Sequence, residues 1–503
     1  NALSQSSLIT QGDGNTPLVL EGHRLYLRRY WRYQQIVTRE IDRRLQPTRA
    51  ALPKSLQASL KALFINNVQQ PDWQKIACVL ALRARFAIIT GGPGTGKTTT
   101  LTKLLSVLIE LAEVENQRKL TILLAAPTGK AAARVSESIA HALQQLPVPE
   151  AVKQQIPQKA STLHRLLGSR PDTRLYRHHR HNPLLADIVI VDEASMIDLE
   201  MMAALLDALP ETAQLILLGD KDQLASVEAG SVMGDLCRGA ADAAYDAATQ
   251  QWIERHVGLL LEAPEREGSG INQQTVMLRH SHRFGAESGI GQLARAVNAG
   301  NATLADAILA DTSSYPDLKR LTLAAADDAA CKRLITASQA TGGQWGYGDY
   351  VQILCDTRPQ DAGAYDAWAA RVLQAFDRFR VLCALRRGDW GVEGINQRIE
   401  RWLFQGTAPS LWYEGRPVMV TRNDYNLGLM NGDIGLALQD VHGKLRVVFP
   451  GNEDQGGLRW LSPMRLPDVE TAYAMTVHKS QGSEFEHVAL ILPPVRSSVI
   501  TWE

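Results

Sequence analysis

The sequence contains 503 residues, of which 45% are hydrophobic, enough for about three or four domains with buried cores, which excludes a disordered chain. The chain has 53 lysines plus arginines and 53 aspartates plus glutamates, so its net charge gives no support to nucleic-acid binding. Any nucleic-acid binding would have to use a local groove. No apolar run reaches the roughly 18 residues that a membrane-spanning helix needs, which argues against a membrane protein.

The cysteines and the first residues indicate where the protein works. Five cysteines are scattered along the chain with no Cys-x-x-Cys pair, which is typical of a reduced, cytoplasmic protein without a zinc site. The start, Asn1 followed by Ala-Leu-Ser, has neither an initiator methionine nor a signal-peptide pattern. We therefore interpret the sequence as an interior fragment of a cytoplasmic protein.

An arginine-rich stretch at residues 24–32 is the first amphipathic segment. Leu25 and Leu27 alternate with Tyr26 and Arg28, which predicts a strand that runs into a helix. Arginines interleaved with aromatic residues occur both in nucleic-acid sites and in protein interfaces. We favour a partner interface here, and the composition does not identify the partner.

Residues 86–100 are the most informative stretch of the chain. An apolar run short enough for a buried strand leads into Gly91-x-x-x-x-Gly96-Lys97-Thr98, and an apolar pattern at helical spacing follows. This order of strand, glycine loop and helix predicts a phosphate loop, in which backbone N–H groups and the helix start bind phosphate oxygens. Lys97 would reach the β- and γ-phosphates of a nucleotide, and Thr98 would hold Mg²⁺.

Two positions near this loop are candidates for binding a base or a polymer. Pro71 and Asp72 predict a helix start before the loop, where Gln74 could hydrogen-bond an adenine edge or remain a solvated side chain. A second buried strand, 120–126, leads into Thr128 at a helix start, which is another place to seat a phosphate. Because the first loop holds the nucleotide, Thr128 is free either for a polymer backbone or for capping its helix.

Residues 169–181 are basic and poor in apolar side chains. They follow the stretch Ser161-Thr-Leu-His-Arg-Leu-Leu-Gly168 and contain four arginines and three histidines. Their length and turn residues suit a small hairpin that protrudes from the core, with an exposed loop as the alternative. The histidines lack the spaced acidic or cysteine partners that a metal site would need.

Two further strands end in residues that suit phosphate chemistry. After the strand at 188–191, Asp192 should hold Mg²⁺ through water, and Glu193 should orient and deprotonate the attacking water. Paired acids at a strand end are sometimes only helix caps, but the phosphate loop upstream favours catalysis. The strand at 215–218 ends in Gly-Asp, and Gln223 follows where a glutamine can touch the γ-phosphate and report hydrolysis.

The middle of the sequence carries fewer signals. Residues 240–272 have the composition of a loose insertion, and 277–284 look like the start of a second α/β domain. In that segment Arg283 is either a phosphate sensor or a salt-bridge partner. Residues 300–378 are alanine-rich and helical in pattern, and 379–385 predict another buried strand.

From residue 412 to 466 the pattern changes to short strands and tight turns. About five short strands, separated by turns such as Asn-Gly-Asp, predict a small barrel inserted into the second domain. The α/β pattern then returns, where Thr476, His478 and Ser480 offer hydroxyl and imidazole donors for a sugar–phosphate backbone.

The set of motifs is more diagnostic than any one of them. Their order is that of superfamily 1 helicases: Gly-Gly-Pro-Gly-Thr-Gly-Lys-Thr, Ala-Pro-Thr-Gly-Lys-Ala-Ala, Val-Asp-Glu-Ala-Ser-Met, Gly-Asp-Lys-Asp-Gln-Leu and Thr-Val-His-Lys-Ser-Gln-Gly-Ser-Glu-Phe. From about Leu25 to the end, the sequence resembles more closely the RecD family, the α chains of exodeoxyribonuclease V (RecBCD). The stretches Ser-Thr-Leu-His-Arg-Leu-Leu-Gly and Asn-Gly-Asp-Ile-Gly belong to the same likeness.

This resemblance implies an ATP-dependent 5′→3′ DNA helicase that uses ATP and Mg²⁺ and acts at double-strand DNA ends. Its partners would be RecB and RecC, with the nuclease site in RecB, and its substrate would be single-stranded DNA and a duplex end. The implied fold is α/β, with two RecA-like P-loop NTPase domains, a pin insertion, an SH3-like β-barrel insertion and an N-terminal helical domain.

The same resemblance implies domain boundaries. The expected order is an N-terminal partner-interface domain at 1–65, motor domain 1 at 66–270 with the pin at about 168–183, the first part of motor domain 2 at 271–410, the barrel at 411–468, and the truncated rest of motor domain 2 at 469–503. The family has a further motif, Thr-Arg-Ala-Arg, whose arginine contacts the γ-phosphate, and we expect it past residue 503.

The motifs and the resemblance together give the expected site. The catalytic residues are Lys97, Glu193, Gln223 and Arg283, and the magnesium ligands are Thr98 and Asp192. The nucleotide-binding residues are Gln74, Gly91, Gly92, Pro93, Gly94, Thr95, Gly96, Lys97, Thr98, Thr99 and Glu484. The DNA-binding residues are Thr128, His164, Thr476 and His478.

Two other functions share these motifs. One is a free-standing RecD-like helicase outside any nuclease complex, although such relatives tend to carry a longer N-terminal region with helix-hairpin-helix elements. The other is an ATP-binding scaffold that regulates a nuclease. The intact set of Lys97, Asp192, Glu193 and Gln223 argues against the scaffold.

Overall fold

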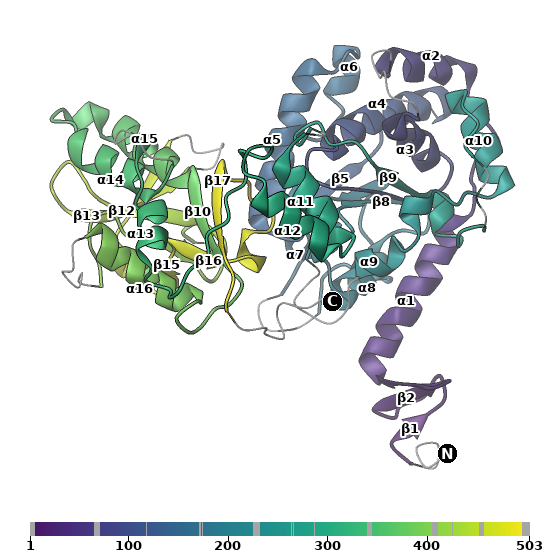
Figure 1. The fold of residues 1–503 in the computed structure, drawn as a ribbon. Helices are drawn as coiled ribbons and strands as arrows, with labels where there is room; N and C mark the ends of the chain where they lie inside the picture. The colour runs from purple at the N-terminus through teal and green to yellow at the C-terminus, as the bar shows by residue number, and fades with distance from the viewer. Residues whose placement is uncertain are drawn as a thin grey trace. The chain divides into compact units, whose positions relative to one another are not determined.

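The computed structural model describes residues 6–494 except 65–70, 117, 171–172, 174, 225–231, 263, 265, 286, 340–344, 405–410, 425 and 452–456. The chain forms two compact units, Asn1–Leu318 and Lys319–Glu503, each with its own hydrophobic core. In Figure 1 the first unit runs from purple to teal and the second from green to yellow.

Unit 1 begins with a small sheet and a long helix. The sheet has the order β1-β2-β3, formed by β1 (Ile9–Thr10), β2 (Leu18–Glu21) and β3 (Arg24–Leu27), and α1 (Arg28–Leu45) follows directly. The expected strand that runs into a helix is therefore confirmed. The buried Arg28 side chain donates to the carbonyl oxygens of Thr16 at 2.6 Å and Gly12 at 2.8 Å, which joins the start of the helix to the sheet.

A parallel sheet forms the centre of unit 1. Its order is β6-β5-β7-β8-β4-β9, and all neighbouring strands are parallel. The strands are β4 (Phe86–Gly91), β5 (Ile122–Ala126), β6 (Ser161–Thr162), β7 (Ile188–Val191), β8 (Gln214–Gly219) and β9 (Thr275–Leu278). The strands expected at 86–89, 120–126, 188–191 and 215–218 are confirmed, with small differences in their ends.

Helices lie before, between and after these strands in the chain. They are α2 (Lys54–Leu63), α3 (Trp73–Ala81), α4 (Lys97–Asn116), α5 (Gly129–Gln145), α6 (Glu150–Lys153), α7 (Leu163–Leu167), α8 (Leu199–Ala208), α9 (Val232–Leu236), α10 (Ala247–Val257), α11 (Gly289–Asn298) and α12 (Ala302–Ala310), with short 3₁₀ helices η2 (Ala194–Met196), η3 (Ala240–Asp242) and η4 (Asn272–Gln274). The prediction of a loose insertion at 240–272 is wrong where α10 forms. Trp252 of this helix is buried, and its indole N–H donates to the Val79 carbonyl oxygen at 2.9 Å.

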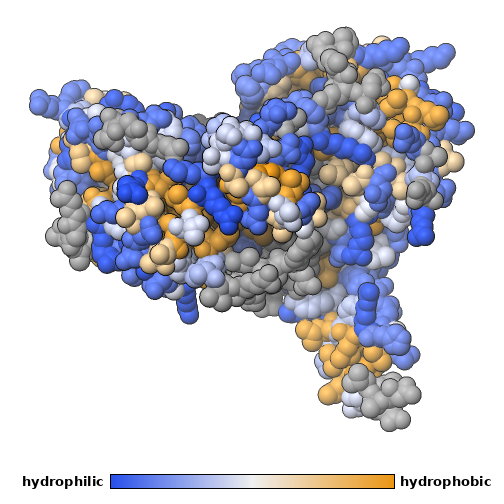
Figure 2. All heavy atoms as spheres, in the orientation of Figure 1, coloured by the Kyte–Doolittle hydropathy of each residue, from blue (hydrophilic) through white to orange (hydrophobic). Residues whose placement is uncertain are grey.

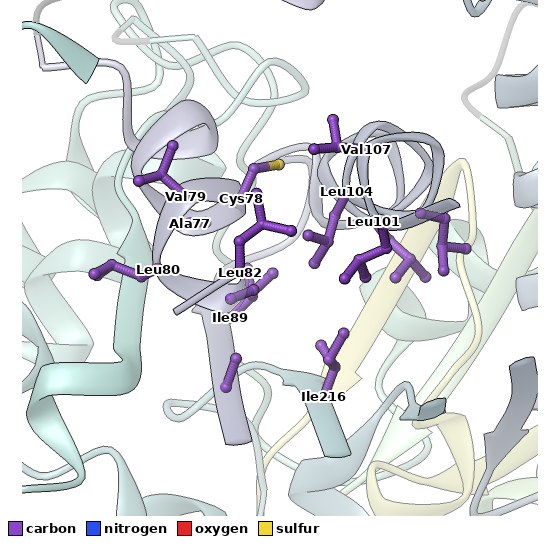
Figure 3. Close-up of a cluster of buried hydrophobic side chains, with 14 of the residues drawn as sticks. Ala77, Cys78, Val79, Leu80, Leu82, Ile89, Leu101, Leu104, Val107 and Ile216 are labelled. Atoms are coloured by element: carbon purple, nitrogen blue, oxygen red, sulfur yellow. The ribbon is translucent and has the colours of Figure 1, made fainter. Parts of the chain in front are cut away.

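The central sheet is covered on both faces. Leu217 of β8 lies in a hydrophobic cluster with Met202 of α8, whereas its neighbour Ile216 lies in a second cluster with Leu101 and Leu104 of α4. Figure 3 shows the second cluster, in which side chains of α3 and α4 gather over the strands. Strands buried on both faces read as continuous apolar runs, which is why the sequence identified them.

The expected start of a second domain at residue 271 differs from the structure. Thr275–Leu278 forms β9, which pairs with β4 so that Leu278 lies beside Gly91. Val276 and Leu278 are buried in the same core as Ile89, and unit 1 ends only at Leu318. β9 therefore belongs to the same sheet as the strand before the phosphate loop, and the segment after it up to Leu318 belongs to unit 1.

Unit 2 contains two sheets. A parallel sheet has the order β16-β10-β17, with β10 (Phe379–Cys383), β16 (Ala474–Thr476) and β17 (His487–Ile491). An antiparallel sheet has the order β14-β13-β12-β11-β15, with β11 (Pro417–Val420), β12 (Ile434–Gln439), β13 (Leu445–Pro450), β14 (Leu458–Leu461) and β15 (Val469–Thr471). About five short strands were expected between 412 and 466, and five are present in this sheet. The last of them, at 469–471, lies beyond the barrel boundary expected at 468.

The helical pattern expected for residues 300–378 is confirmed by helices in the part of this segment that belongs to unit 2, and a further helix follows at 392–403. They are α13 (Ala329–Ile335), α14 (Tyr347–Asp356), α15 (Tyr365–Asp377) and α16 (Val392–Leu403), with η6 (Ala362–Ala364), η7 (Pro463–Arg465) and η8 (His478–Ser480) as 3₁₀ turns. In the part of the chain that the structure describes, no helix is both long and apolar enough to cross a membrane.

Candidate nucleotide site

The loop between β4 and α4 has the backbone of an anion cradle. Gly94 has a φ of 72° and Gly96 a φ of 82°, both in the left-handed region that side-chain-bearing residues rarely adopt. The loop is closed by its own threonines, since Thr95 Oγ1 donates to the Gly92 carbonyl oxygen at 2.9 Å and Thr100 Oγ1 to that of Gly96 at 2.8 Å. Backbone N–H groups at the start of α4 are thereby gathered at one place.

Lys97 lies over the beginning of this loop. Its Nζ donates to the carbonyl oxygen of Gly91 at 2.6 Å and to that of Gly92 at 3.2 Å. These bonds hold the amine beside the cradle, where phosphate oxygens would replace the carbonyl partners. Thr98 and Thr99 follow in the first turn of α4, next to the same N–H groups.

Two carboxylates follow β7. Asp192 accepts a hydrogen bond from the Glu193 N–H at 2.8 Å, and Glu193 has a φ of 51°. A glutamate in the left-handed region is strained by about 1–3 kcal/mol, and such strain is concentrated at functional sites. Glu193 Oε2 is buried and has no hydrogen-bond partner among the described residues. This carboxylate is therefore held ready for a group that the protein itself does not supply.

The carboxylates at this edge of the sheet are harder to ionise than exposed ones. Burial raises the pKa of Glu193, and the charge of Asp192 raises it further, while Lys97 and Arg134 act in the opposite direction. Burial also raises the pKa of Asp192 and of Asp220. The charge of Lys97 lowers the pKa of all three carboxyl groups, so the amine and the acids share one electrostatic environment.

The turn after β8 brings Gln223 to the same edge. The Gln223 N–H donates to the Asp220 carbonyl oxygen at 3.3 Å, and the Lys221 N–H donates to Thr90 Oγ1 of β4 at 3.1 Å. The carboxyl ends of parallel strands meet at one edge, and β8 lies between β7 and β4 in the sheet. Gln223 therefore follows the strand that lies between the acid pair and the phosphate loop.

Gln74 contacts the loop directly. It lies in the first turn of α3, whose N-cap Asp72 accepts from the Lys75 N–H at 3.0 Å, as the sequence predicted. Gln74 Nε2 donates to the Thr95 carbonyl oxygen at 3.4 Å, and a Cβ added to Gly96 would lie 2.4 Å from this nitrogen. The Gln74 amide thus lies beside the cradle.

Arg283 also lies against the loop, although the sequence assigned it to another domain. A Cβ added to Gly94 would come within 2.4 Å of the Arg283 Cβ, and the His282 N–H donates to the Gly94 carbonyl oxygen at 2.8 Å. The Arg283 side chain is exposed. The structure therefore brings Arg283 to the phosphate loop within unit 1.

The sequence did not single out Arg134. This arginine lies on α5, is half-buried, and is close enough to Glu193 and Asp192 for their charges to raise its pKa, although burial lowers the pKa more strongly. The only sequence signal at this position was a single cation after three alanines, Ala131-Ala-Ala-Arg134. Arg134 supplies positive charge behind the acid pair.

The candidate DNA-binding residues fall into two groups. In unit 1, Thr128 caps α5 by accepting from the Ala131 N–H at 3.2 Å, and His164 is exposed on α7 with its ring 6.2 Å from that of Tyr176. In unit 2, Thr476 ends β16 and accepts from the Lys479 N–H at 3.3 Å, and His478 begins η8.

Glu484, a candidate nucleotide-binding residue, also lies in unit 2. It is exposed and follows η8 by four residues. The structure therefore gathers Gln74, the loop, Asp192, Glu193, Gln223 and Arg283 in unit 1, whereas Thr476, His478 and Glu484 belong to the second unit.

These features define an α/β domain of the P-loop nucleotide-binding class. The glycine cradle, the lysine beside it and the unpartnered buried carboxylate oxygen fit a nucleoside triphosphate with a divalent cation. A family model described as an AAA domain matches residues 74–229, the segment that carries the loop and the acid pair.

Comparison with other proteins identifies the family. The RecBCD enzyme subunit RecD of Haemophilus influenzae is 37% identical over 100% of this chain and 78% of its own length. That of Mycolicibacterium smegmatis is 36% identical with the same coverage. A Bacteroides Pif1 structure bound to single-stranded DNA has 17% identity and a TM-score of 0.39, over 84% of this chain and 86% of that one. At 37% identity over its full length, the chain belongs to the RecD family.

Gly94→Ala should weaken nucleotide binding by about tenfold or more, because the left-handed backbone costs a residue with a side chain about 1–2 kcal/mol and the added methyl group would overlap Arg283. Titration with a non-hydrolysable ATP analogue measures the change. Gly270→Ala is the matched control, since this glycine lies outside the loop, a Cβ there would make only an ordinary 3.7 Å contact with Leu45, and φ is not in the left-handed range. Equal affinity for the two variants would contradict the proposed role of the cradle.

Proposed function

We propose that this protein is an ATP-dependent DNA helicase, the motor subunit of a RecBCD-type helicase–nuclease in bacterial recombinational repair. The observation that carries the proposal is the phosphate loop whose Lys97 acts electrostatically on both Asp192 and Glu193, in a chain that is 37% identical to a RecD over its whole length. Because both Asp192 and Glu193 are present, a motor that hydrolyses ATP is favoured over a scaffold that only binds it.

Each residue of the site has a chemical task in this proposal. Lys97 and Arg283 bring positive charge to the γ-phosphate, and Glu193 accepts a proton from the attacking water. Mg²⁺, held by Thr98 and Asp192, would supply charge neutralisation at the β- and γ-phosphates. Gln74 and Glu484 hold the nucleotide with loop residues 91–99, and Gln223 senses the γ-phosphate.

The DNA strand would contact groups from both units. We assign Thr128 and His164 of unit 1 and Thr476 and His478 of unit 2 to the sugar–phosphate backbone, because hydroxyl and imidazole donors suit phosphate oxygens. Two RecA-like domains would carry these groups, so that ATP hydrolysis changes the grip of one domain relative to the other. Movement along the strand would run 5′→3′.

We assign the expected insertions to the work on duplex DNA. The described part of 168–183 contains bridges between Ser169 and Tyr176 and between His179 and Asn182, which support a hairpin for the proposed pin; residues 171–172 and 174 lie outside the described residues. The antiparallel sheet of unit 2 supports an SH3-like insertion.

The N-terminal sheet and α1 would bind the RecB and RecC partners. Leu8, Leu25 and Leu27 expose 57%, 47% and 51% of their surface, and Figure 2 shows hydrophobic residues gathered at this end of the chain. Burying such side chains against a partner would contribute about 25 cal/mol per Å². Such a complex would act in the cytoplasm.

The direction of movement provides a test of the proposed function. With ATP and Mg²⁺, the full-length protein should unwind a duplex with a 5′ single-stranded overhang, because a 5′→3′ motor must load on that strand. A strand-displacement assay measures this, with a 3′ overhang of the same sequence as the control. Unwinding only from the 3′ overhang would reject the assigned polarity.

A free-standing helicase is the second candidate. The ATP-dependent RecD2 DNA helicase of Deinococcus radiodurans is 29% identical over 81% of this chain, but the match covers only 43% of that protein. The RecD matches cover 78% of their own lengths, which favours the nuclease-complex subunit. Purification of the full-length untagged protein distinguishes the two, because only a complex subunit would bring two large partners with it.

A further inference from the structure

The turn at residues 281–284, here called the Ser281 turn, lies against the phosphate loop. Ser281 Oγ donates to the Pro93 carbonyl oxygen at 2.9 Å, and the His282 N–H donates to the Gly94 carbonyl oxygen at 2.8 Å. Both bonds use carbonyl oxygens of the loop. Phosphate oxygens bind N–H groups instead, so the turn holds the loop without competing for the donors that a nucleotide needs.

The Ser281 hydroxyl makes a second bond at the same time. It accepts from the Phe284 N–H at 3.1 Å, so a single oxygen joins the phosphate loop to the turn that contains Arg283. Within this turn the Arg283 Cβ lies so close to Gly94 that only glycine fits opposite it. The backbone of Arg283 is thus fixed to the loop.

The turn continues into α11, which is capped independently. Ser288 Oγ accepts from the Gly291 N–H at 3.4 Å, and Asp317 accepts from the Gly289 N–H at 3.1 Å and from Ser288 Oγ at 3.0 Å. These bonds stabilise the helix start but do not reach the phosphate loop. Ser288 is therefore a serine of the same segment with a purely local role.

We propose that Ser281 is a positioning residue of the ATPase site: by fastening the phosphate loop to the turn of Arg283, it sets where this arginine meets the γ-phosphate. The proposal rests on the ATP hydrolysis proposed above. Nucleotide binding depends on the loop N–H groups and Lys97, which Ser281 does not touch. The hydrolytic step depends on aligned charge, and misplacement of a catalytic group by about 1 Å can lower a rate by about 10²-fold.

Ser281→Ala should therefore lower kcat for DNA-stimulated ATP hydrolysis by about tenfold, with KM for ATP changed much less, because one bridging hydroxyl is worth about 1 kcal/mol or somewhat more. Ser281→Thr keeps the hydroxyl and should retain most of the activity. Ser288→Ala should leave kcat unchanged while lowering the melting temperature, since it removes only a helix cap.

A double-mutant cycle separates positioning from simple stabilisation. If Ser281 acts through Arg283, then Ser281→Ala should have no further effect in an Arg283→Ala background. Should Ser281→Ala fail to fold, as judged by circular dichroism, Ser281→Cys provides the same comparison with a weaker donor of similar size.

Three results would overturn the proposal: kcat of Ser281→Ala close to that of the unchanged protein, additive losses with Arg283→Ala, or an equal loss of kcat in Ser288→Ala. Absence of DNA-stimulated hydrolysis in the unchanged full-length protein is a different result, because it would reject the proposed function itself.

Discussion

Lys97→Ala should reduce ATP hydrolysis by about 10²- to 10³-fold, because a positioned cation is removed from the place where phosphate charge is stabilised. The Lys97 amine already lies at the start of the loop, where it donates to the Gly91 and Gly92 carbonyl oxygens and would exchange these partners for phosphate oxygens. Release of inorganic phosphate in the presence of single-stranded DNA measures the rate.

The exposed Lys119, which lies beyond the far end of α4, is the matched control for this change. Lys119→Ala removes the same charge from the protein without touching the loop and should hydrolyse ATP normally. If Lys97→Ala also turned over ATP at the normal rate, the assignment of the phosphate loop would be wrong.

Glu193→Gln should lower hydrolysis by about 10²-fold or more while ATP remains bound, because the amide keeps the shape of the side chain but cannot accept the proton from water. Binding of a fluorescent ATP analogue and single-turnover hydrolysis measure the two effects separately. Glu137→Gln is the control, since this exposed glutamate of α5 contributes to the field at Arg134 but is not part of the acid pair. Loss of binding in Glu193→Gln would point to a structural role instead.

The pH dependence of the rate follows from the raised pKa of Glu193. Only the deprotonated carboxylate can accept a proton, so kcat/KM should fall as the pH falls through the pKa of Glu193, which lies above the ordinary value for a glutamate. The negative charge of Asp220 contributes to raising this pKa. Asp220→Asn should therefore move the acid limb of the profile to lower pH.

The sequence predicted those parts of the site whose chemistry lies in contiguous residues. The phosphate loop and the Asp192–Glu193 pair each follow a buried strand within a few positions, so local pattern was sufficient to place them. The buried strands around these motifs agree with the structure within a few residues for the same reason, whereas the expected loose insertion at 240–272 and the end of the barrel insertion do not.

Contacts between distant elements could not be predicted in this way. The apolar pattern of Val276 and Leu278 is compatible with either sheet, and only the pairing of β9 with β4 shows which one contains it. Arg134 and Ser281 reach the site from a helix and a turn whose orientation depends on packing. The left-handed backbone conformation of Glu193 could likewise not be predicted, because glutamate has no local preference for it.

The insertion in unit 2 has a consequence for the order in which this unit folds. β10 ends at Cys383 and pairs with β16, which begins at Ala474, so the parallel pairing must close a loop of roughly 90 residues. Pairing of β11 with β15 brings the two ends of the insertion together, since Val418 lies opposite Thr471. The entropy lost on closing a loop grows with its length, and each halving of that length saves about 0.6 kcal/mol. The antiparallel sheet should therefore form first, and the strand that ends in Thr476 should join the parallel sheet late in folding.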